Sequence, residues 1–326
     1  MSQRSKVSYP LVSIILVTYN GWPFIRDCLK SLERLRYPDV EVIVGDNAST
    51  RSQQGKLRSQ TYNLNLQLIF NPENTGFAGG CNRGLLAAKG EYIALLNNDA
   101  TADPLWINAL VEVVERDPTI GLVVGKIYRI DRKPKPEVFD SAGSLYNQIG
   151  SAWSRGYLET DAGQYDREEE VPMGTGGACL FRRSIIEKTY LFDESFFMYM
   201  EELDFCLRVR QLGYRIVYTP KAVVYHRFSL SVKKAAANQV LFKQFYGNRA
   251  RIKILAKYYP WSILIPNFWL IIASFGFWDI YFLRFGGIKK FWELKVNQWR
   301  FLRAGLRERR NFAGNTAWTQ WIVRQG

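Results

Sequence analysis

The stretches VSIILVTYNG at residues 12–21, VEVIVGDNAST at residues 40–50 and YIALLNNDA at residues 92–100 decide the fold that this sequence predicts. Each begins with a β-branched or otherwise apolar run and ends in small polar residues, which is typical of a buried strand that runs into a turn. Runs of this kind predict strands at 12–17, 40–44, 66–70 and 92–96. The amphipathic segments between them predict helices at 23–35, 52–62 and 78–89. This alternation indicates an α/β fold with a mostly parallel twisted sheet flanked by helices.

In such sheets, ligands bind beyond the carboxyl ends of the strands. The turns at those ends are polar, and they hold Thr18-Tyr19-Asn20-Gly21, Asp46 to Thr50, Asn71 to Asn82 and Asn97-Asn98-Asp99. We therefore expect these four turns to lie together at one edge of the sheet.

The chain continues with less regular patterns up to residue 228. We expect a helix at 104–116, a strand at 121–129, loops or a hairpin over 131–170, a helix at 201–212, and strands at 216–218 and 223–225. These elements complete a first predicted domain at 1–228. The remaining residues, 229–326, form a second predicted region with a different composition.

The excess positive charge of the chain lies almost entirely in this second region. Residues 1–226 hold 26 Lys and Arg against 27 Asp and Glu, whereas residues 227–326 hold 18 against 3. The region combines a basic segment at 239–259, an uncharged apolar run at 261–278, and a basic segment that ends at Arg310. It predicts helices lying on an anionic membrane surface, because the apolar run is shorter than the ~20 residues needed to cross a bilayer and contains Pro266. The alternatives are a helical subdomain packed on the catalytic core and an oligomer interface.

Four scattered cysteines and an amino terminus without a charged-then-apolar leader predict a cytosolic chain with reduced thiols. With the basic region, this composition places the protein at the cytoplasmic face of the plasma (inner) membrane, peripheral or monotopic.

Two turns have residue types that suit a phosphorylated ligand. Asp46 follows a buried strand, where a carboxylate can accept hydrogen bonds from a base or a ribose; the alternative is that it closes a turn. Asn97 and Asp99 follow the strand at 92–96 and point the same way in an extended segment, which suits a hard cation such as Mg²⁺ or Mn²⁺. The single histidine, His226, is either a further metal ligand or a packed residue.

Glu201, Glu202 and Asp204 open the predicted helix at 201–212. A carboxylate there could take the proton of an acceptor hydroxyl. Acidic residues in the first turn also stabilise a helix through its dipole, and that is the alternative.

In this order, the motifs resemble glycosyltransferase family two, the inverting enzymes with the GT-A fold, and within it a rhamnosyltransferase-like branch. The resemblance covers about two thirds of the chain, from Val12 to His226, and rests on VTYN at 17–20, DNAS at 46–49, NxGFAGGxN at 74–82, LLNND at 95–99 and EELD at 201–204.

The family implies roles for individual residues. The residues that it implies for donor binding are Thr18, Tyr19, Asn20, Asp46, Asn74, Gly79, Gly80, Asn82 and Asn98. The residues that it implies on the acceptor side are Gly176, Gly177, Ala178 and Arg182. It implies a divalent cation, Mg²⁺ or Mn²⁺, at Asp99, Asn97 and His226.

Two positions depart from the family pattern. Asn97 replaces the first aspartate of the metal motif, and Glu202 stands at the position of the catalytic base, with Asp204 as a neighbouring or competing base. The resemblance implies a single displacement with inversion, from a nucleotide-diphosphate sugar to a saccharide or lipid-linked saccharide. Deoxythymidine-diphosphate (dTDP) rhamnose is our first expectation for the donor and a uridine-diphosphate (UDP) sugar the second.

Other classes of protein explain less of the sequence. A nucleic-acid enzyme accounts for the basic tail but not for the acidic, glycine-rich front part. A sugar nucleotidyltransferase usually carries a basic phosphate-contacting loop after the first strand, and residues 18–23 hold no Lys or Arg. A non-catalytic membrane scaffold is the third alternative.

Overall fold

The computed structural model describes residues 9–130, 137–227, 236–309 and 317–323. The strands are β1 (Val12–Thr18), β2 (Val40–Asp46), β3 (Leu66–Phe70), β4 (Tyr92–Leu96), β5 (Ala100–Ala102), β6 (Ile120–Arg129), β7 (Phe139–Ser141), β8 (Ser144–Tyr146), β9 (Ala152–Ser154), β10 (Glu169–Glu170), β11 (Ala178–Arg182) and β12 (Arg215–His226). The α-helices are α1 (Trp22–Leu32), α2 (Arg51–Arg58), α3 (Gly76–Ala87), α4 (Trp106–Arg116), α5 (Arg183–Lys188), α6 (Glu201–Gln211), α7 (Ala236–Tyr258), α8 (Trp261–Leu264) and α9 (Phe268–Glu308). Two 3₁₀ turns are η1 (Glu194–Phe196) and η4 (Ala317–Trp321).

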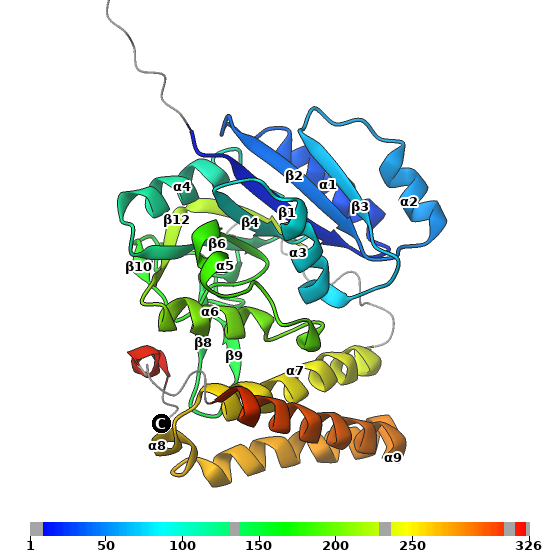
Figure 1. Ribbon diagram of the computed structural model, residues 1–326, viewed down its shortest axis with the longest axis vertical. Coiled ribbons are helices and arrows are strands. Elements are labelled where there is room, and N and C mark those ends of the chain that lie inside the picture. Colours follow the sequence, from blue (N-terminus) through cyan, green and yellow to red (C-terminus); the bar gives the residue numbers. More distant parts are fainter. Residues whose placement is uncertain (1–8, 131–136, 228–235, 310–316, 324–326) are drawn as a thin grey trace, which may run out of the picture.

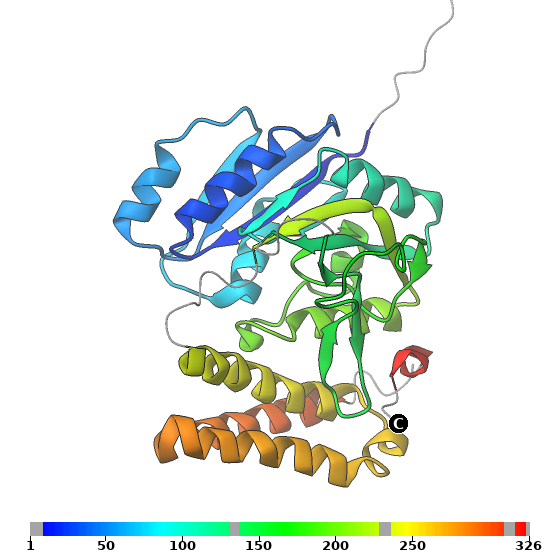
Figure 2. The same cartoon turned by 180° about the vertical axis from the view of Figure 1, so that it is seen from behind.

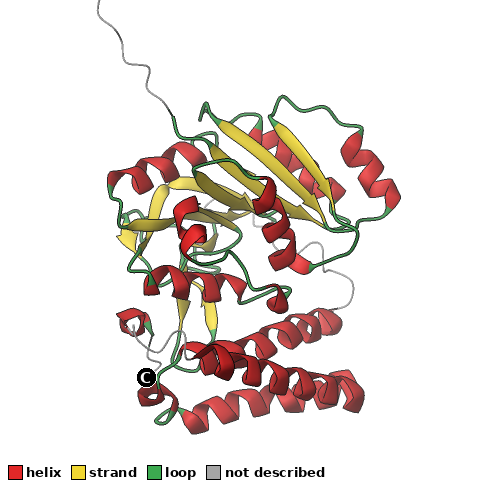
Figure 3. Ribbon diagram, in the orientation of Figure 1, coloured by secondary structure: helices red, strands yellow, loops and turns green. Residues whose placement is uncertain are grey.

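One large sheet forms the centre of the molecule (Figures 1 and 3). Its strands follow the order β10-β12-β6-β11-β4-β1-β2-β3, with β5 on β12 and β7 on β6. β1, β2, β3 and β4 are parallel neighbours, as are β6 and β12, whereas β11 runs antiparallel between β4 and β6. The predicted α/β fold with a mostly parallel sheet is therefore confirmed.

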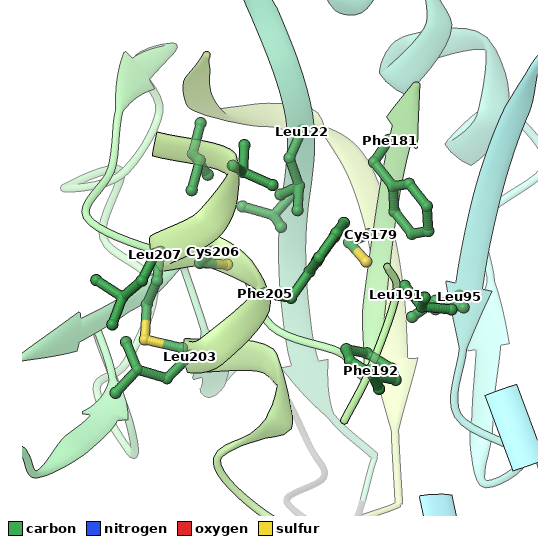
Figure 4. Close-up of a cluster of buried hydrophobic side chains, with 14 of the residues drawn as sticks. Leu95, Leu122, Cys179, Phe181, Leu191, Phe192, Leu203, Phe205, Cys206 and Leu207 are labelled. Atoms are coloured by element: carbon green, nitrogen blue, oxygen red, sulfur yellow. The ribbon is translucent and has the colours of Figure 1, made fainter. Parts of the chain in front are cut away.

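Both faces of the sheet are covered because its central strands are apolar on both sides. In β1, Val12, Ile14 and Leu16 belong to the core that includes α1 and α4, whereas Ile15 belongs to the opposite core with α3 and α6. Figure 4 shows the second core, in which Phe205 of α6 lies against Cys179 and Phe181 of β11. This packing sets how the first turn of α6 faces the sheet edge.

Several elements differ from the sequence prediction. The two strands predicted at 216–218 and 223–225 form the single strand β12, whose register shifts between Thr219 and Val223, where Pro220 supplies no N–H donor. The helix predicted at 52–62 ends at Arg58. Of the loops predicted over 131–170, residues 131–136 lie outside the described residues, and the rest include β7, the hairpin β8–β9, and β10. All four cysteines are buried and free, as predicted.

The tail is helical over its described part and lies at one end of the molecule, with α7 between the sheet layers and α9 (Figures 1 and 2). The predicted domain boundary at 228/229 and the predicted helix end at Arg310 lie outside the described residues.

Asp204 of α6 joins the sheet-containing part of the molecule to this tail through a buried ionic network. Its Oδ2 accepts a hydrogen bond from Arg208 at 2.9 Å, and its Oδ1 accepts from Lys257 at 2.9 Å and from the hydroxyl of Tyr258 at 2.8 Å. Lys257 also pairs with Glu308 at 2.9 Å. One carboxylate of α6 therefore fixes α7 directly, and α9 through Lys257.

We predict that Asp204→Asn destabilises the fold. Removing one partner of a buried ion pair costs roughly 3–5 kcal/mol, because the remaining charges stay buried. Urea unfolding at pH 7 measures this loss. The control Asp27→Asn removes part-exposed pairs with Arg26 and Arg227 and should cost less than about 1 kcal/mol for each pair. Equal losses in the two variants would contradict the assignment.

The pH dependence of this loss follows from the pKa of Asp204. Burial acts to raise this pKa, but Arg208 and Lys257 outweigh burial and hold it below the ordinary value of 3.8. A group whose pKa is lowered on folding stabilises the fold above its unfolded pKa and loses this contribution as pH falls through its folded pKa. The stabilities of parent and Asn variant should therefore converge below about pH 4.

Candidate active site

The turns after β1, β2 and β4 are tied together by side-chain hydrogen bonds. Asn20, with a φ of 51°, accepts from the Thr50 N–H at 2.9 Å, and its own N–H donates to the Ser49 hydroxyl at 2.7 Å. The Asn98 amide donates to the Thr18 hydroxyl at 3.0 Å. Three of the four turns expected at one edge therefore meet.

The fourth turn, after β3, joins through Asn47. Its Oδ1 accepts from the Asn71 amide at 2.8 Å, and its Nδ2 donates to the Gly76 carbonyl at 2.6 Å. Gly76 opens α3 with a φ of +71°, and a side chain there would collide with the Phe197 carbonyl. Glycine at 76 is therefore needed both for the backbone conformation and for the close approach of the segment that precedes α6.

Asp46 closes its own turn. Its Oδ1 accepts from the Ser49 N–H at 3.0 Å and from the Gln54 amide at 2.8 Å, so the turn-closing alternative describes this oxygen. The side chain is buried at the edge where the turns meet.

His226 brings together residues from three strands or turns. Its Nε2 lies 3.0 Å from Asp99 Oδ1 and 3.5 Å from Asn97 Nδ2, and its Nδ1 lies 2.9 Å from Asp140 Oδ2. A small cavity adjoins this group, lined by Asn97, Ala100, Ile127, Asp140, Thr175, Gly177, Val224 and His226. Asp140 orients the ring from behind, while Asp99 lies at its other nitrogen.

The two carboxylates determine the charge of the histidine. Burial alone would lower the pKa of His226, but hydrogen bonds to Asp140 and Asp99 outweigh burial and raise the pKa to about 10. When protonated, the imidazole therefore offsets the charge of two carboxylates that are largely buried.

A divalent cation fits these residues as a replacement for the proton. A histidine with a carboxylate on its far nitrogen is the usual arrangement around a bound metal. Within the described ranges, no three His, Cys, Asp or Glu side chains converge on one point. Asp99, His226 and the Asn97 amide would therefore supply only part of a coordination shell, and a hard cation would take its other oxygen ligands from water or a ligand.

Glu201 and Glu202 begin α6 after a stretch of unusual backbone. Phe197, Tyr199 and Met200 all have positive φ, a conformation that side chains rarely adopt. The Phe197 carbonyl accepts a hydrogen bond from the Ala78 N–H of α3 at 3.2 Å. The Phe197 ring stacks on the ring of Tyr246 in α7, with 4.9 Å between the ring centroids. Contacts from both sides therefore hold the segment that presents the two glutamates.

Gly176 and Gly177 lie between the glutamates and the histidine group. A Cβ at Gly176 would lie 3.7 Å from that of Glu202, and one at Gly177 would lie 3.0 Å from the Asn97 amide. Ala178 follows in β11, paired with Leu96 at the end of β4. This glycine pair links Glu202 to Asn97.

The two glutamates differ in environment. Burial raises the pKa of Glu201 well above its ordinary value, and the charge of Glu202 raises it further. Burial also raises the pKa of Glu202, but a hydrogen bond from Glu201 and the charge of Lys243 oppose this rise. Of the two, Glu201 therefore binds a proton more readily, and Glu202 is the half-buried member of the pair.

Three predicted site residues are engaged elsewhere. Asp204 was predicted as a competing base, but the ionic network described above occupies both of its oxygens. Arg182 was predicted on the acceptor side, but its guanidinium donates to the Ile120 carbonyl at 2.9 Å and to the Tyr92 hydroxyl at 3.0 Å, where β4 begins. The amide of Asn82 pairs with the backbone of Phe192, at 3.1 and 2.8 Å, rather than facing the edge.

The remaining predicted donor residues lie around the start of α3 and the β1 turn. Asn74 accepts from the Gly76 N–H at 2.9 Å. Gly79 and Gly80 are buried inside α3, where a Cβ would collide with the side chains of Thr75 and Val17. Tyr19 is 51% exposed at the same edge. The N–H groups of Gly76 and Ala78 at the start of α3 are already paired, with Asn74 and with the Phe197 carbonyl, so they are less available to a ligand.

Asp140, Ser49 and Lys243 lie at this site but are not among the site residues predicted from the sequence. Asp140 lies in the three-residue strand β7 within a stretch without periodicity, so no pattern marked it. Ser49 belongs to the DNAS motif, and its link to Asn20 was the available signal. Lys243 comes from α7 and lies 5.9 Å from the Tyr199 ring, a contact that only the folded tail creates.

Comparisons with known proteins show what the chain is similar to. A family model, glycosyl transferase family 2, matches residues 13–190. The chain is 29% identical over 253 residues to the N-acetylglucosaminyl-diphospho-decaprenol L-rhamnosyltransferase of Mycobacterium tuberculosis, covering 71% of this chain and 80% of the relative. It is 26% identical over 223 residues to an uncharacterized glycosyltransferase of Haemophilus influenzae, covering 67% of this chain and 65% of the relative.

Solved structures share the fold. GalNAc-T7 with UDP, GalNAc and Mn²⁺ aligns with a TM-score of 0.63 at 15% identity, over 78% of this chain and 49% of that one. The mannosyltransferase PcManGT of Pyrobaculum calidifontis, in complex with GDP-Man and Mn²⁺, aligns with a TM-score of 0.57 at 18% identity, over 97% of this chain and 84% of that one.

We predict that His226→Gln destabilises the chelator-treated protein by about 1.5–3 kcal/mol at pH 6.5, the range for hydrogen bonds to charged groups. A histidine whose pKa is raised on folding stabilises the fold fully below its unfolded pKa, near 6.5, and loses this contribution as pH rises through about 10. Denaturant unfolding at several pH values should therefore find the difference shrinking from pH 6.5 to pH 10. A difference that stays constant across this range would contradict the protonated bridge.

Proposed function

The chain belongs to glycosyl transferase family 2 and is a glycosyltransferase, and on that premise we propose that it moves one sugar from a nucleotide-diphosphate donor to a hydroxyl of a lipid-linked saccharide, with inversion. The observation that carries the proposal is the edge where the turns after β1, β2, β3 and β4 meet His226, with Glu202 beside Gly176.

We assign the donor nucleoside to the turns after β1 and β2. Thr18, Tyr19, Asn20 and Asp46 supply hydroxyl, aromatic, amide and carboxylate groups there. The cross-link between Asn20 and Thr50 holds the two turns at a fixed spacing before any ligand arrives. Preorganisation of this kind lowers the entropy cost of binding.

Glu202 is the proposed base. The acceptor oxygen attacks the anomeric carbon, its proton passes to the Glu202 carboxylate, and the bond from that carbon to the diphosphate oxygen breaks, so the nucleoside diphosphate leaves with the electron pair. A pKa raised by burial makes Glu202 a stronger base than an exposed glutamate, and the hydrogen bond from Glu201 opposes that rise.

Asp99, His226 and Asn97 are the residues that would hold a divalent cation. When bound, Mg²⁺ or Mn²⁺ neutralises charge that develops on the departing diphosphate. Loss of the His226 proton is the step on this chain's side that would make room for the cation.

One relative supports the proposed sugar and acceptor. Its name describes rhamnosyl transfer to N-acetylglucosaminyl-diphospho-decaprenol. We propose dTDP-rhamnose as the donor, a UDP sugar as the second candidate, and a lipid-diphosphate saccharide as the acceptor. A lipid-linked acceptor requires the enzyme to work at a membrane surface, and we place it at the cytoplasmic face.

A panel of nucleotide sugars, with and without Mn²⁺, tests the donor assignment. We predict that dTDP-rhamnose raises the melting temperature only when Mn²⁺ or Mg²⁺ is present, since ligand binding stabilises the folded state by mass action. Asp99→Asn should lose most of the shift that depends on the cation, with the shift of each variant measured from its own melting temperature without ligand. If no nucleotide sugar stabilises the protein, or if the shift is the same in chelator, the donor site is wrong.

The base assignment is tested by Glu202→Gln. General-base catalysis contributes roughly 10²–10⁴-fold, so we predict a loss of that size in kcat, with donor-induced stabilisation unchanged. Glu201→Gln is the matched control, because the Gln side chain carries no charge and keeps an N–H group that can donate a hydrogen bond to Glu202. The kcat of this control should stay within a few-fold of the parent. The proposal fails if Glu202→Gln turns over like the parent.

A further inference from the structure

The tail carries a large apolar surface that the rest of the molecule leaves uncovered. In α9, Trp269, Ile280 and Trp299 are 78%, 68% and 60% exposed. Only 11% of the most apolar 18-residue window of this helix is buried. Soluble proteins rarely leave an apolar face of this size open to water.

α9 is a hairpin of two arms rather than one straight helix. Gly287 has φ 75° and ψ 169°, which breaks the helix into a first arm (residues 268–286) and a second arm (residues 288–308). Both views show the arms doubling back beside each other (Figures 1 and 2). Lys295 of the second arm pairs with Asp279 of the first, and a buried cluster joins Leu241 of α7 to Phe282 and Leu294.

Each arm therefore has one face on the protein and one face outward. On the first arm, Trp269, Ile272, Phe277, Ile280 and Leu283 are exposed at helical spacing. On the second arm, the exposed residues Ile288, Trp292, Trp299 and Leu306 follow the same spacing.

Basic side chains border the apolar residues of the second arm. Lys289, Arg300, Arg303 and Arg307 are exposed beside them, against a single exposed acidic residue on that arm, Glu293. Apolar residues flanked by cations match the boundary between the acyl chains and the headgroups of an anionic bilayer.

We propose that the α9 hairpin docks flat on an anionic phospholipid bilayer, with both arms in the plane of the interface and neither arm crossing it. This inference deepens the proposed function, because it names the surface at which a lipid-linked acceptor is met. The occupant is argued from charge: a second copy of this chain would bring the same cationic border against itself.

The architecture opposes a transmembrane arrangement. The helical stretch from Phe268 to the residue before Arg284 is 16 residues, or about 24 Å, which is shorter than the ~30 Å hydrocarbon core, and the charged Asp279 interrupts it. Arg251 of α7 donates to the Ser274 hydroxyl at 3.0 Å, so the first arm is also tied to the protein along its inner face. To cross a bilayer, this arm would have to leave α7 and the second arm.

Flotation with vesicles tests the docking face without any nucleotide or acceptor, so it can fail independently of the proposed function. The parent should float with vesicles of phosphatidylcholine mixed with phosphatidylglycerol, and much less with phosphatidylcholine alone or in high salt. The double variant Trp269→Glu, Ile280→Glu should lose flotation. The control Leu86→Glu replaces an 88% exposed leucine on α3 and should float like the parent.

Replacing Arg300, Arg303 and Arg307 with Gln should weaken binding to the anionic vesicles about fivefold for each residue. Failure of the parent to float, or equal binding by the parent and the Trp269→Glu, Ile280→Glu variant, would overturn the proposal. So would a parent that ignores the vesicles and sediments as a dimer that this double variant dissociates, because the face would then be an interface between copies.

Labelling distinguishes docking from spanning. Trp261→Cys and Lys289→Cys lie just before the first arm and at the start of the second, and the four native cysteines are buried. With protein bound to intact vesicles, a maleimide that cannot cross the bilayer should label both introduced cysteines from outside. Protection of the cysteine at 289 until detergent is added would show that the first arm crosses the membrane and would overturn the proposal.

Discussion

A buried negative charge must be neutralised where it lies, and for Asp204 the neutralising groups come from separate parts of the chain. Arg208 belongs to the same helix, whereas Lys257 and Tyr258 come from α7, and Lys257 reaches Glu308 at the end of α9. This constraint fixes the rotation of α6. It turns Glu202 toward Gly176 and ties the tail to the helix that carries the proposed base.

The sheet edge supplies the opposite wall. The turns after β1, β2, β3 and β4 are short, and they are joined by hydrogen bonds between amide and hydroxyl groups rather than by ion pairs. The charged side chains at this edge are Asp46, and Asp99 and Asp140 with His226 between them. A cation and a diphosphate would thus meet a site whose polar framework is already in place. The α9 hairpin lies beyond α7, on the far side from the sheet layers.

The sequence predicted the strands and the edge well, because apolar runs and polar turns are local signals. It could not assign side chains whose role depends on distant partners. Asp204 and Glu202 share one helical turn, and the contacts of Asp204 with Arg208, Lys257 and Tyr258 distinguish them. Arg182 lies five residues after Gly177, and an extended strand carries it about 17 Å across the sheet to the opposite edge. The contact of Asp140 with His226 could not be predicted from the sequence, because it depends on the pairing of β7 with β6.

The central claim is that one sheet edge binds a nucleotide diphosphate and a cation between Asp99 and His226. The most direct measurement is a crystal structure of the protein with dTDP and Mn²⁺, with anomalous scattering used to locate the manganese. We expect an anomalous peak within coordination distance of Asp99 and His226, with the nucleoside against the β1 and β2 turns. Manganese or nucleotide bound elsewhere, with the Asp99–His226–Asp140 bridge intact, would contradict it.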